Sequence, residues 1–175
     1  MSEYDPLAGR TIVPKRTGVI VDIDGTLCDV TSIRHYVLVP EGVEKDFDSF
    51  HRESVHCPPH QQTLDYIRNA VEDGHDIIFV SARKEKWRQP TELFIGKHMT
   101  GLQWFGPFMR ANGDVRKDFE VKRDIHTHLS RWWNIVGAID DNPSIIALWE
   151  ELGIPVEIVP GWSNEAAAAY IQGDQ

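Results

Sequence analysis

The strongest constraint on this 175-residue chain is an apolar run that ends in two aspartates and a glycine, residues 18–27 with the sequence GVIVDIDGTL. From Val19 to Ile23 every residue but one is β-branched, which predicts a strand buried on both faces, as in a parallel sheet. Residues two apart on an extended backbone point to the same side, so Asp22 and Asp24 are expected to share one small space at the carboxyl end of that strand. Open α/β sheets bind their ligands at this edge, so the motif predicts where a site lies.

Two carboxylates this close repel each other unless a cation or a proton lies between them, so a divalent metal site is the economical explanation. Gly25 allows the backbone to turn sharply, and Thr26 offers a hydroxyl to the group that the carboxylates hold. Asp-x-Asp-Gly also occurs in ordinary turns and in calcium loops. A calcium loop needs an acidic ligand late in a loop of about twelve residues between two helices, whereas this motif follows a strand.

Strand and helix patterns alternate along the rest of the chain. Further strands are predicted at 77–80, 102–109, 135–139 and 156–159, and helices at 61–72, 91–98, 119–132, 144–152 and after Asn164. This alternation predicts the α/β class, with a Rossmann-like parallel sheet flanked by helices and right-handed crossovers. Residues 1–17 are expected to form an N-terminal tail or leading loop, and residues 18–175 one domain. Residues 28–59 are too many for a simple connection, so they are expected to form a small helical cap insertion over the site.

Polar side chains stand at the ends of three predicted strands: Asp22 and Asp24, then Ser81, then Asp140 with Asp141. The ends of parallel strands lie side by side, so residues more than a hundred positions apart are expected to converge on one rim. Taken alone, Asp140 or Asp141 could cap the helix that begins near Pro143, and a serine could be a turn residue. Taken together, these residues offer a nucleophile, metal ligands and a phosphate donor.

The charge of the chain bears on its ligand and its location. The net charge of −9 argues against broad, non-specific binding to nucleic acid. Residues 83–123 nevertheless hold ten Lys or Arg against five acids, a local basic surface that suits a phosphorylated ligand or is simply a solvated face. No apolar run approaches the ~20 residues of a membrane helix and no signal segment begins the chain, so a cytoplasmic location and no membrane partner are expected.

Three residue types have ordinary structural interpretations. His35, His51, His56 and His60 lack the spacing of metal ligands and are expected on the surface or in the cap insertion. Cys28 and Cys57 are expected to be reduced structural thiols. Trp132 and Trp133 are expected in the core.

The order of the motifs resembles that of the haloacid dehalogenase (HAD) superfamily of phosphotransferases. Its Asp-x-Asp-Gly-Thr motif matches residues 22–26, its Ser or Thr after a strand matches Ser81, its lysine matches Lys122, and its acidic pair matches Asp140 and Asp141. More narrowly, the chain resembles the 3′-phosphatase domains of bacteriophage polynucleotide kinase/phosphatases. The matching stretches are residues 80–83, 109–110, 113–118, 121–122, 138–141, 148–149 and 152–154.

The resemblance implies a Mg²⁺-dependent reaction through an aspartyl-phosphate. Asp22 would attack the phosphorus, and Asp24 would protonate the leaving oxygen and then activate water. Mg²⁺ would be bound by Asp22, the backbone carbonyl of Asp24 and one of the two adjacent aspartates, Asp140 or Asp141. Ser81 and Lys122 would hold the phosphoryl oxygens as charge builds on them.

The family's substrate-binding arginines correspond to Arg83 and Arg110 by spacing, and to Arg34 with an offset of one residue. Thr26 is also expected to bind substrate, and Asp118 would orient an arginine or lysine at the rim of the site. The phage enzymes also carry a kinase domain with a Gly-rich phosphate loop ending in Gly-Lys-Ser/Thr. No such loop occurs in this sequence, so a phosphatase without an ATP-dependent step is expected.

The leading hypothesis is a Mg²⁺-dependent phosphatase acting on 3′-phosphate ends of DNA or RNA. A phosphatase of free nucleotides or other small phosphoesters is the alternative, favoured by the net charge and the cap insertion. A non-enzymatic phospho-acceptor domain is disfavoured, because signalling receivers carry their acidic pair on the first strand, whereas here it follows the fourth. The oligomeric state is left open.

Overall fold

The computed structural model describes residues 3–5, 10–12 and 15–160. The helix predicted after Asn164 lies outside these residues. Strands β1 (Glu3–Asp5) and β2 (Arg10–Ile12) pair antiparallel in a small sheet of their own. Within the segment expected to be a tail or leading loop, the described residues thus form two short strands, and the first strand of the main sheet begins at Arg16.

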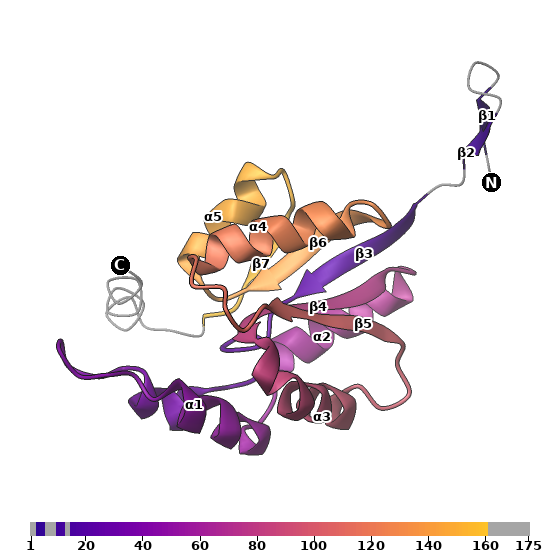
Figure 1. Cartoon of the computed structure of the whole chain (residues 1–175). Coiled ribbons are helices and arrows are strands. Elements are labelled where there is room, and N and C mark those ends of the chain that lie inside the picture. Colours follow the sequence, from indigo (N-terminus) through magenta and orange to yellow (C-terminus); the bar gives the residue numbers. More distant parts are fainter. Residues whose placement is uncertain (1–2, 6–9, 13–14, 161–175) are drawn as a thin grey trace.

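The main sheet contains five strands in the order β5-β4-β3-β6-β7, and every neighbouring pair is parallel. Its strands are β3 (Arg16–Val21), β4 (Asp76–Lys84), β5 (Trp104–Arg110), β6 (Trp133–Asp140) and β7 (Val156–Ile158). Helices flank the sheet on both sides (Figure 1). The predicted Rossmann-like α/β class is confirmed, and the strand that leads into Asp22 lies at the centre of the sheet.

Alternating side chains of β3 explain the two helical layers. Val19 and Val21 pack in one core cluster with residues of α2 (Gln61–Glu72) and α3 (Arg88–His98). Ile20 points to the other face and packs with residues of α4 (Asp118–Leu129) and α5 (Pro143–Glu151). A strand with apolar residues on both faces therefore requires a helical layer on each side.

Two strands end at positions that differ from the prediction. β3 stops at Val21, so Asp22 and Asp24 lie in the turn that follows it, where Gly25 has a φ of +82°. β4 continues to Lys84, although its pairing with β3 ends at Phe79, because it goes on pairing with β5. The backbone beyond Phe79 therefore extends past the end of the central strand and borders the site.

The segment after β3 folds into a helical insertion, as predicted. It contains η1 (Thr31–Tyr36), α1 (Phe47–Glu53) and η2 (Ser54–His56). Asp46 caps α1 by accepting a hydrogen bond from the Ser49 N–H at 2.8 Å. In Figure 1, α1 lies beyond the carboxyl ends of the strands. Cys28 and Cys57 are buried and are not joined by a disulfide.

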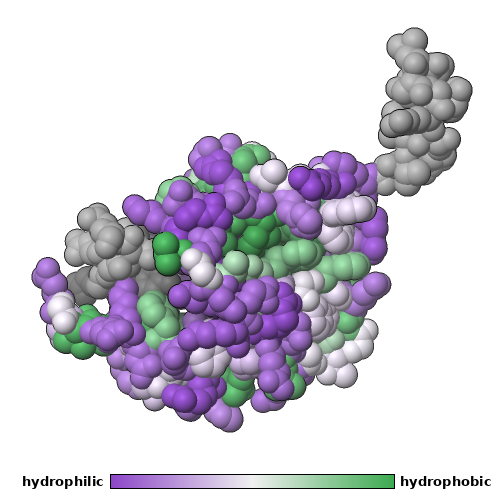
Figure 2. All heavy atoms as spheres, in the orientation of Figure 1, coloured by the Kyte–Doolittle hydropathy of each residue, from purple (hydrophilic) through white to green (hydrophobic). Residues whose placement is uncertain are grey.

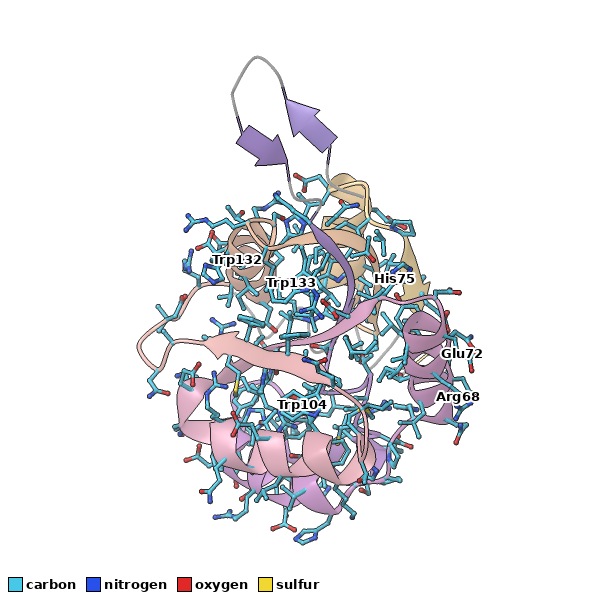
Figure 3. All side chains as sticks on the ribbon, turned by 90° about the vertical axis from the view of Figure 1, so that its right-hand side faces the viewer. Arg68, Glu72, His75, Trp104, Trp132 and Trp133 are labelled. Atoms are coloured by element: carbon cyan, nitrogen blue, oxygen red, sulfur yellow. The ribbon has the colours of Figure 1, made fainter. Side chains whose placement is uncertain are left out.

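The opposite edge of the sheet carries the two adjacent tryptophans (Figure 3). Trp133 is half-buried at the start of β6, and its Nε1–H donates to Asp76 Oδ2 at 2.7 Å. Trp132 is 63% exposed, so the prediction that it lies in the core is wrong. It stands in the turn between α4 and β6, outside both elements.

The face of the molecule drawn in Figure 2 is mostly hydrophilic, and its hydrophobic residues gather in a band beside α4 and the sheet. Within residues 3–5, 10–12 and 15–160, no helix is long and apolar enough to span a membrane.

Candidate active site

Three buried carboxylates meet at the carboxyl edge of the sheet. Asp22 follows β3, while Asp140 ends β6 and Asp141 comes directly after it. One ligand atom from each of the three lies within 4.8 Å of the others. Asp141 Oδ1 accepts a hydrogen bond from Thr26 Oγ1 at 3.0 Å, whereas its buried Oδ2 has no hydrogen-bond partner in the part of the chain that the structure describes. A clustered acidic set with an unsatisfied oxygen fits a hard divalent cation.

Lys122 of α4 reaches into this cluster from the side. Its Nζ donates to Asp22 Oδ1 at 2.6 Å and to Asp140 Oδ2 at 2.8 Å. Although burial alone would lower the pKa of Lys122, the charges of Asp140 and Asp22 raise it above its usual range. Asp140 Oδ1 also accepts from the Asn142 N–H at 3.1 Å, so both oxygens of Asp140 are engaged. Asp141 is therefore better placed than Asp140 to ligate a cation.

The helix-capping alternative for the acidic pair is wrong. Asn142 is the N-cap of α5, and its Oδ1 accepts hydrogen bonds from the Ser144 N–H at 3.0 Å and the Ser144 hydroxyl at 2.9 Å. Pro143 occupies the first turn, as expected. Neither Asp140 nor Asp141 is needed to cap α5, so both side chains are available to the carboxylate cluster.

Burial and the neighbouring carboxylates disfavour the charged forms of two aspartates. Burial raises the pKa of Asp22 to about 7 despite the proximity of Lys122. Burial and the negative charges of Asp22 and Asp140 also raise the pKa of Asp141. Ionising the whole cluster is therefore unfavourable in the metal-free protein, and a divalent cation would relieve that repulsion.

A pH-dependent stability follows from the raised pKa of Asp22. The folded state keeps a proton that the unfolded chain loses near pH 4, so the associated stability is lost as the pH rises toward about 7. Relative to Asp22→Asn, the metal-free wild type should lose up to about 1.4 kcal/mol per pH unit over this range. Urea unfolding from pH 5 to pH 8 measures this difference. Saturating Mg²⁺ should cancel the loss, and a difference that is independent of pH would contradict the assignment.

Asp24 lies in a separate, strongly bonded arrangement with Arg83 of β4. The Arg83 Nε–H donates to Asp24 Oδ2 at 2.8 Å, and its Nη2 donates to Asp24 Oδ1 and to Ser54 Oγ. Its Nη1 donates to Thr91 Oγ1 at 3.0 Å, and Arg83 is only 3% exposed. Burial raises the pKa of Asp24, but the Arg83 charge outweighs it and holds the pKa below its ordinary value. Arg83 thus holds the Asp24 side chain in place and favours its ionised form.

Arg110, at the end of β5, is likewise committed to protein groups. Its Nε–H donates to the Ala82 carbonyl at 2.9 Å, and its other donors bind the Arg116 carbonyl and Asp118. These bonds hold the segment between β5 and α4 against the rim. Ser81 lies within β4, and its Oγ accepts from the Arg83 N–H at 3.2 Å, which leaves its hydroxyl proton to donate.

These side chains line a pocket of about 740 Å³. Seven Lys or Arg side chains contribute to its wall, but nine carboxylates do as well, so the pocket is not a basic groove. Seven of those carboxylates lie outside residues 83–123. Three come from the insertion, Glu44, Asp46 and Asp48, and four stand at or after the ends of β3 and β6, Asp22, Asp24, Asp140 and Asp141. The excess of positive charge within residues 83–123 is therefore offset by acids from elsewhere in the chain.

The structure does not bring every proposed site residue into the pocket. Asp22, Asp24, Ser81, Arg83, Arg110, Asp118, Lys122, Asp140 and Asp141 line it. Thr26 lies beneath it and donates to Asp141, while Arg34 lies in η1 outside the lining residues. Burial lowers the pKa of Arg34, and the charges of Asp141 and Asp29 act in the opposite direction.

His51 is a pocket residue that the sequence analysis placed on the surface or in the insertion. It belongs to α1, is 8% exposed, and its Nδ1 lies 3.9 Å from Asp24 Oδ2. Burial lowers its pKa to about 4, so the ring is neutral at physiological pH. The sequence does contain a signal for this position. His51 follows Phe47 by four residues, and residues at that spacing in a helix lie on the same face.

Comparison with known proteins complements this geometry. The family model "Polynucleotide kinase PNKP phosphatase domain" matches residues 16–160. A search of curated protein sequences finds no match. A chain of the Pnkp1/Rnl/Hen1 RNA repair complex is similar in structure, with a TM-score of 0.67 and 22% identity over 83% of this chain and 42% of that chain. The present chain thus spans less than half the length of that protein.

Two further solved structures share the fold. The class C acid phosphatase from Bacillus anthracis with tungstate bound has a TM-score of 0.60 and 15% identity, over 90% of this chain and 73% of that chain. A haloacid dehalogenase-like hydrolase from Streptococcus pneumoniae has a TM-score of 0.60 and 14% identity, over 89% and 90%. At these identities the structural likeness shows the fold alone.

Proposed function

Because this chain belongs to the polynucleotide kinase PNKP phosphatase domain family, within the haloacid dehalogenase phosphatases, we propose that it removes the phosphate from 3′-phosphorylated ends of nucleic acids. The observation that carries this proposal is the pairing of two carboxylates with different surroundings in one pocket. Asp22 lies beside Asp141 and Lys122, whereas Asp24 is bound by Arg83. Such a division supplies one carboxylate to attack phosphorus and another to move protons.

The groups that would hold Mg²⁺ are the carboxylates of Asp22 and Asp141 and the backbone carbonyl of Asp24. The unsatisfied Oδ2 of Asp141 supports this choice over Asp140, whose oxygens bind Lys122 and the Asn142 N–H. When bound, the cation would neutralise charge between the nucleophile and the phosphate. Asp140 would then serve to hold Lys122 in place.

In the first half of the reaction, an oxygen of Asp22 attacks the phosphorus and the bond to the leaving 3′-oxygen breaks. Lys122 binds Asp22 Oδ1 at 2.6 Å, which leaves Oδ2 to form the new bond. Asp24 gives a proton to the leaving oxygen. Ser81 and Lys122 donate to the phosphoryl oxygens as their charge redistributes.

In the second half, water attacks the aspartyl-phosphate while Asp24 takes its proton, and inorganic phosphate leaves from a regenerated Asp22 carboxylate. The Arg83 pairing favours ionised Asp24, which suits this step. The dianionic phosphate of a bound substrate opposes that effect, because nearby negative charge raises the pKa of a carboxyl group. Asp24 would therefore be protonated more readily with substrate bound than in the free enzyme.

A phosphatase of free nucleotides or other small phosphoesters is the second candidate. The pocket is lined by more carboxylates than cations, and α1 of the insertion forms part of its wall. A long polyanion would meet those acids, whereas a mononucleotide would place a single phosphate beside Lys122.

Substrate preference and its salt dependence separate the two candidates. With Mg²⁺, we expect kcat/KM for a 3′-phosphorylated oligonucleotide to exceed that for a nucleoside 3′-monophosphate by at least about tenfold, a difference of ~1.4 kcal/mol in transition-state stabilisation. A 5′-phosphorylated oligonucleotide is the matched control and should react much more slowly. Recognition of the strand should also make log kcat/KM fall steeply with log salt concentration. Equal or better hydrolysis of the mononucleotide would support the second candidate instead.

A further inference from the structure

Three aromatic side chains form a continuous wall on one side of the pocket. We call Phe47, His51 and Trp87 the aromatic wall; the first two belong to α1, and the third to η3 (Glu85–Trp87). The Phe47 and His51 rings have centroids 6.1 Å apart with 25° between their planes, and the His51 and Trp87 centroids are 5.6 Å apart. All three line the pocket that contains Asp22.

The aromatic wall is not simply part of the core. Phe47 is 42% exposed and Trp87 is half-buried, so neither ring is fully covered by protein. The two halves come from separate segments, and an ion pair between Lys86 and Asp48 at 2.6 Å joins them. Partly exposed rings held together at a polar pocket indicate a surface for a planar apolar group.

The position of the aromatic wall relative to Asp24 indicates which part of a substrate it would meet. His51 Nδ1 lies 3.9 Å from Asp24 Oδ2 and has no hydrogen-bond partner in the described part of the chain. Asp24 is the group assigned to protonate the leaving oxygen, so it marks the leaving-group side of the phosphorus. Whatever is attached to that oxygen would extend toward the aromatic wall.

We propose that the aromatic wall binds the nucleobase of the nucleoside that carries the phosphate. This inference rests on the proposed function, because the assignment of the leaving-group side comes from the role of Asp24. A base can stack on Trp87 or Phe47 whatever its identity, since every base has a π-face. A sugar phosphate without a base would leave the rings uncovered.

The test compares a nucleoside 3′-monophosphate with its abasic counterpart, a tetrahydrofuran 3′-phosphate of the same sugar frame. Wild-type kcat/KM should favour the nucleoside by at least about fivefold. Trp87→Ala should reduce that ratio by fivefold or more, and Phe47→Leu should reduce it in the same direction. Trp132→Ala removes an exposed tryptophan at the opposite edge of the sheet and should leave the ratio unchanged. A ratio that is the same in wild type, Trp87→Ala and Phe47→Leu would overturn the inference.

A binding measurement separates failure of this inference from failure of the proposed function. Calorimetric titration of Asp22→Asn with the two ligands reports base recognition without turnover. If the wild type hydrolyses neither these two substrates nor a 3′-phosphorylated oligonucleotide, the proposed function fails. Tighter binding of the nucleoside that is lost in the Asp22→Asn, Trp87→Ala double variant would still support the aromatic wall. If a 3′-phosphorylated oligonucleotide is hydrolysed but the nucleoside and abasic ligands are bound equally well, the proposed function stands and the aromatic wall does not bind the base.

Discussion

Asp22→Asn is expected to abolish turnover, with a fall in kcat of at least about 10⁴-fold. The amide keeps the shape of the side chain but lacks the anionic oxygen that would bond to phosphorus. Phosphate release from a 3′-phosphorylated oligonucleotide, under single-turnover and steady-state conditions, measures the loss. Trapping of labelled phosphate on the wild-type protein, and its absence from the variant, would identify the covalent intermediate.

The same substitution should not unfold the protein. Burial already disfavours the ionised form of Asp22, so removing the charge relieves an unfavourable interaction in the metal-free state. Urea unfolding near pH 7.5 without metal should therefore give a midpoint for Asp22→Asn at or above that of the wild type. Full phosphatase activity in this folded variant would show that another residue is the nucleophile.

Lys122→Met is expected to be the most destabilising single change in the site, lowering the free energy of unfolding by about 3–5 kcal/mol. Lys122 is buried between Asp22 and Asp140, at 2.6 Å and 2.8 Å. Methionine fills a similar volume but leaves the two carboxylates without their cation. The loss should be smaller at pH 5 than at pH 8, because protonation of Asp22 removes part of the repulsion.

A matched control lies on the same helix. Arg123 is the next residue of α4 and pairs with Glu151 at 2.7 Å, but that pair is on the surface. Arg123→Met should therefore change stability far less than Lys122→Met. The activity of Lys122→Met, measured where the variant remains folded, should fall on the order of 10²–10³-fold because the proposed donor to the phosphoryl oxygens is lost. Similar unfolding midpoints for the two variants would contradict the buried ion-pair arrangement.

Much of the fold could be predicted because its signals are local. The β-branched run before Asp22 and the apolar spacing of residues 61–72 specify a buried strand and a helix from adjacent residues alone. Strand ends were less predictable. β4 continues past Phe79 because β5 still pairs with it there, and no local pattern records the length of a neighbouring strand.

The positions of the acidic residues at the site could also be predicted, but their partners could not. The parallel sheet brings Asp22, Asp140 and Asp141 together by topology. By contrast, Arg83 was expected to bind substrate, and the structure engages its guanidinium with Asp24, Ser54 and Thr91. Those contacts depend on how β4, the insertion and α3 pack against one another.

The sequence by itself determined the α/β class and the meeting of Asp22, Asp140 and Asp141 at the carboxyl edge of the sheet. Both follow from strand periodicity and parallel topology, which the chain carries residue by residue, whereas Lys122 was assigned through the resemblance to the HAD superfamily. Only the tertiary structure decided that Asp141 keeps an oxygen without a hydrogen-bond partner among the described residues, that His51 lies beside Asp24, and that acids offset the basic segment in the pocket. Each of these depends on distances between elements far apart in the chain, and a one-dimensional pattern does not contain those distances.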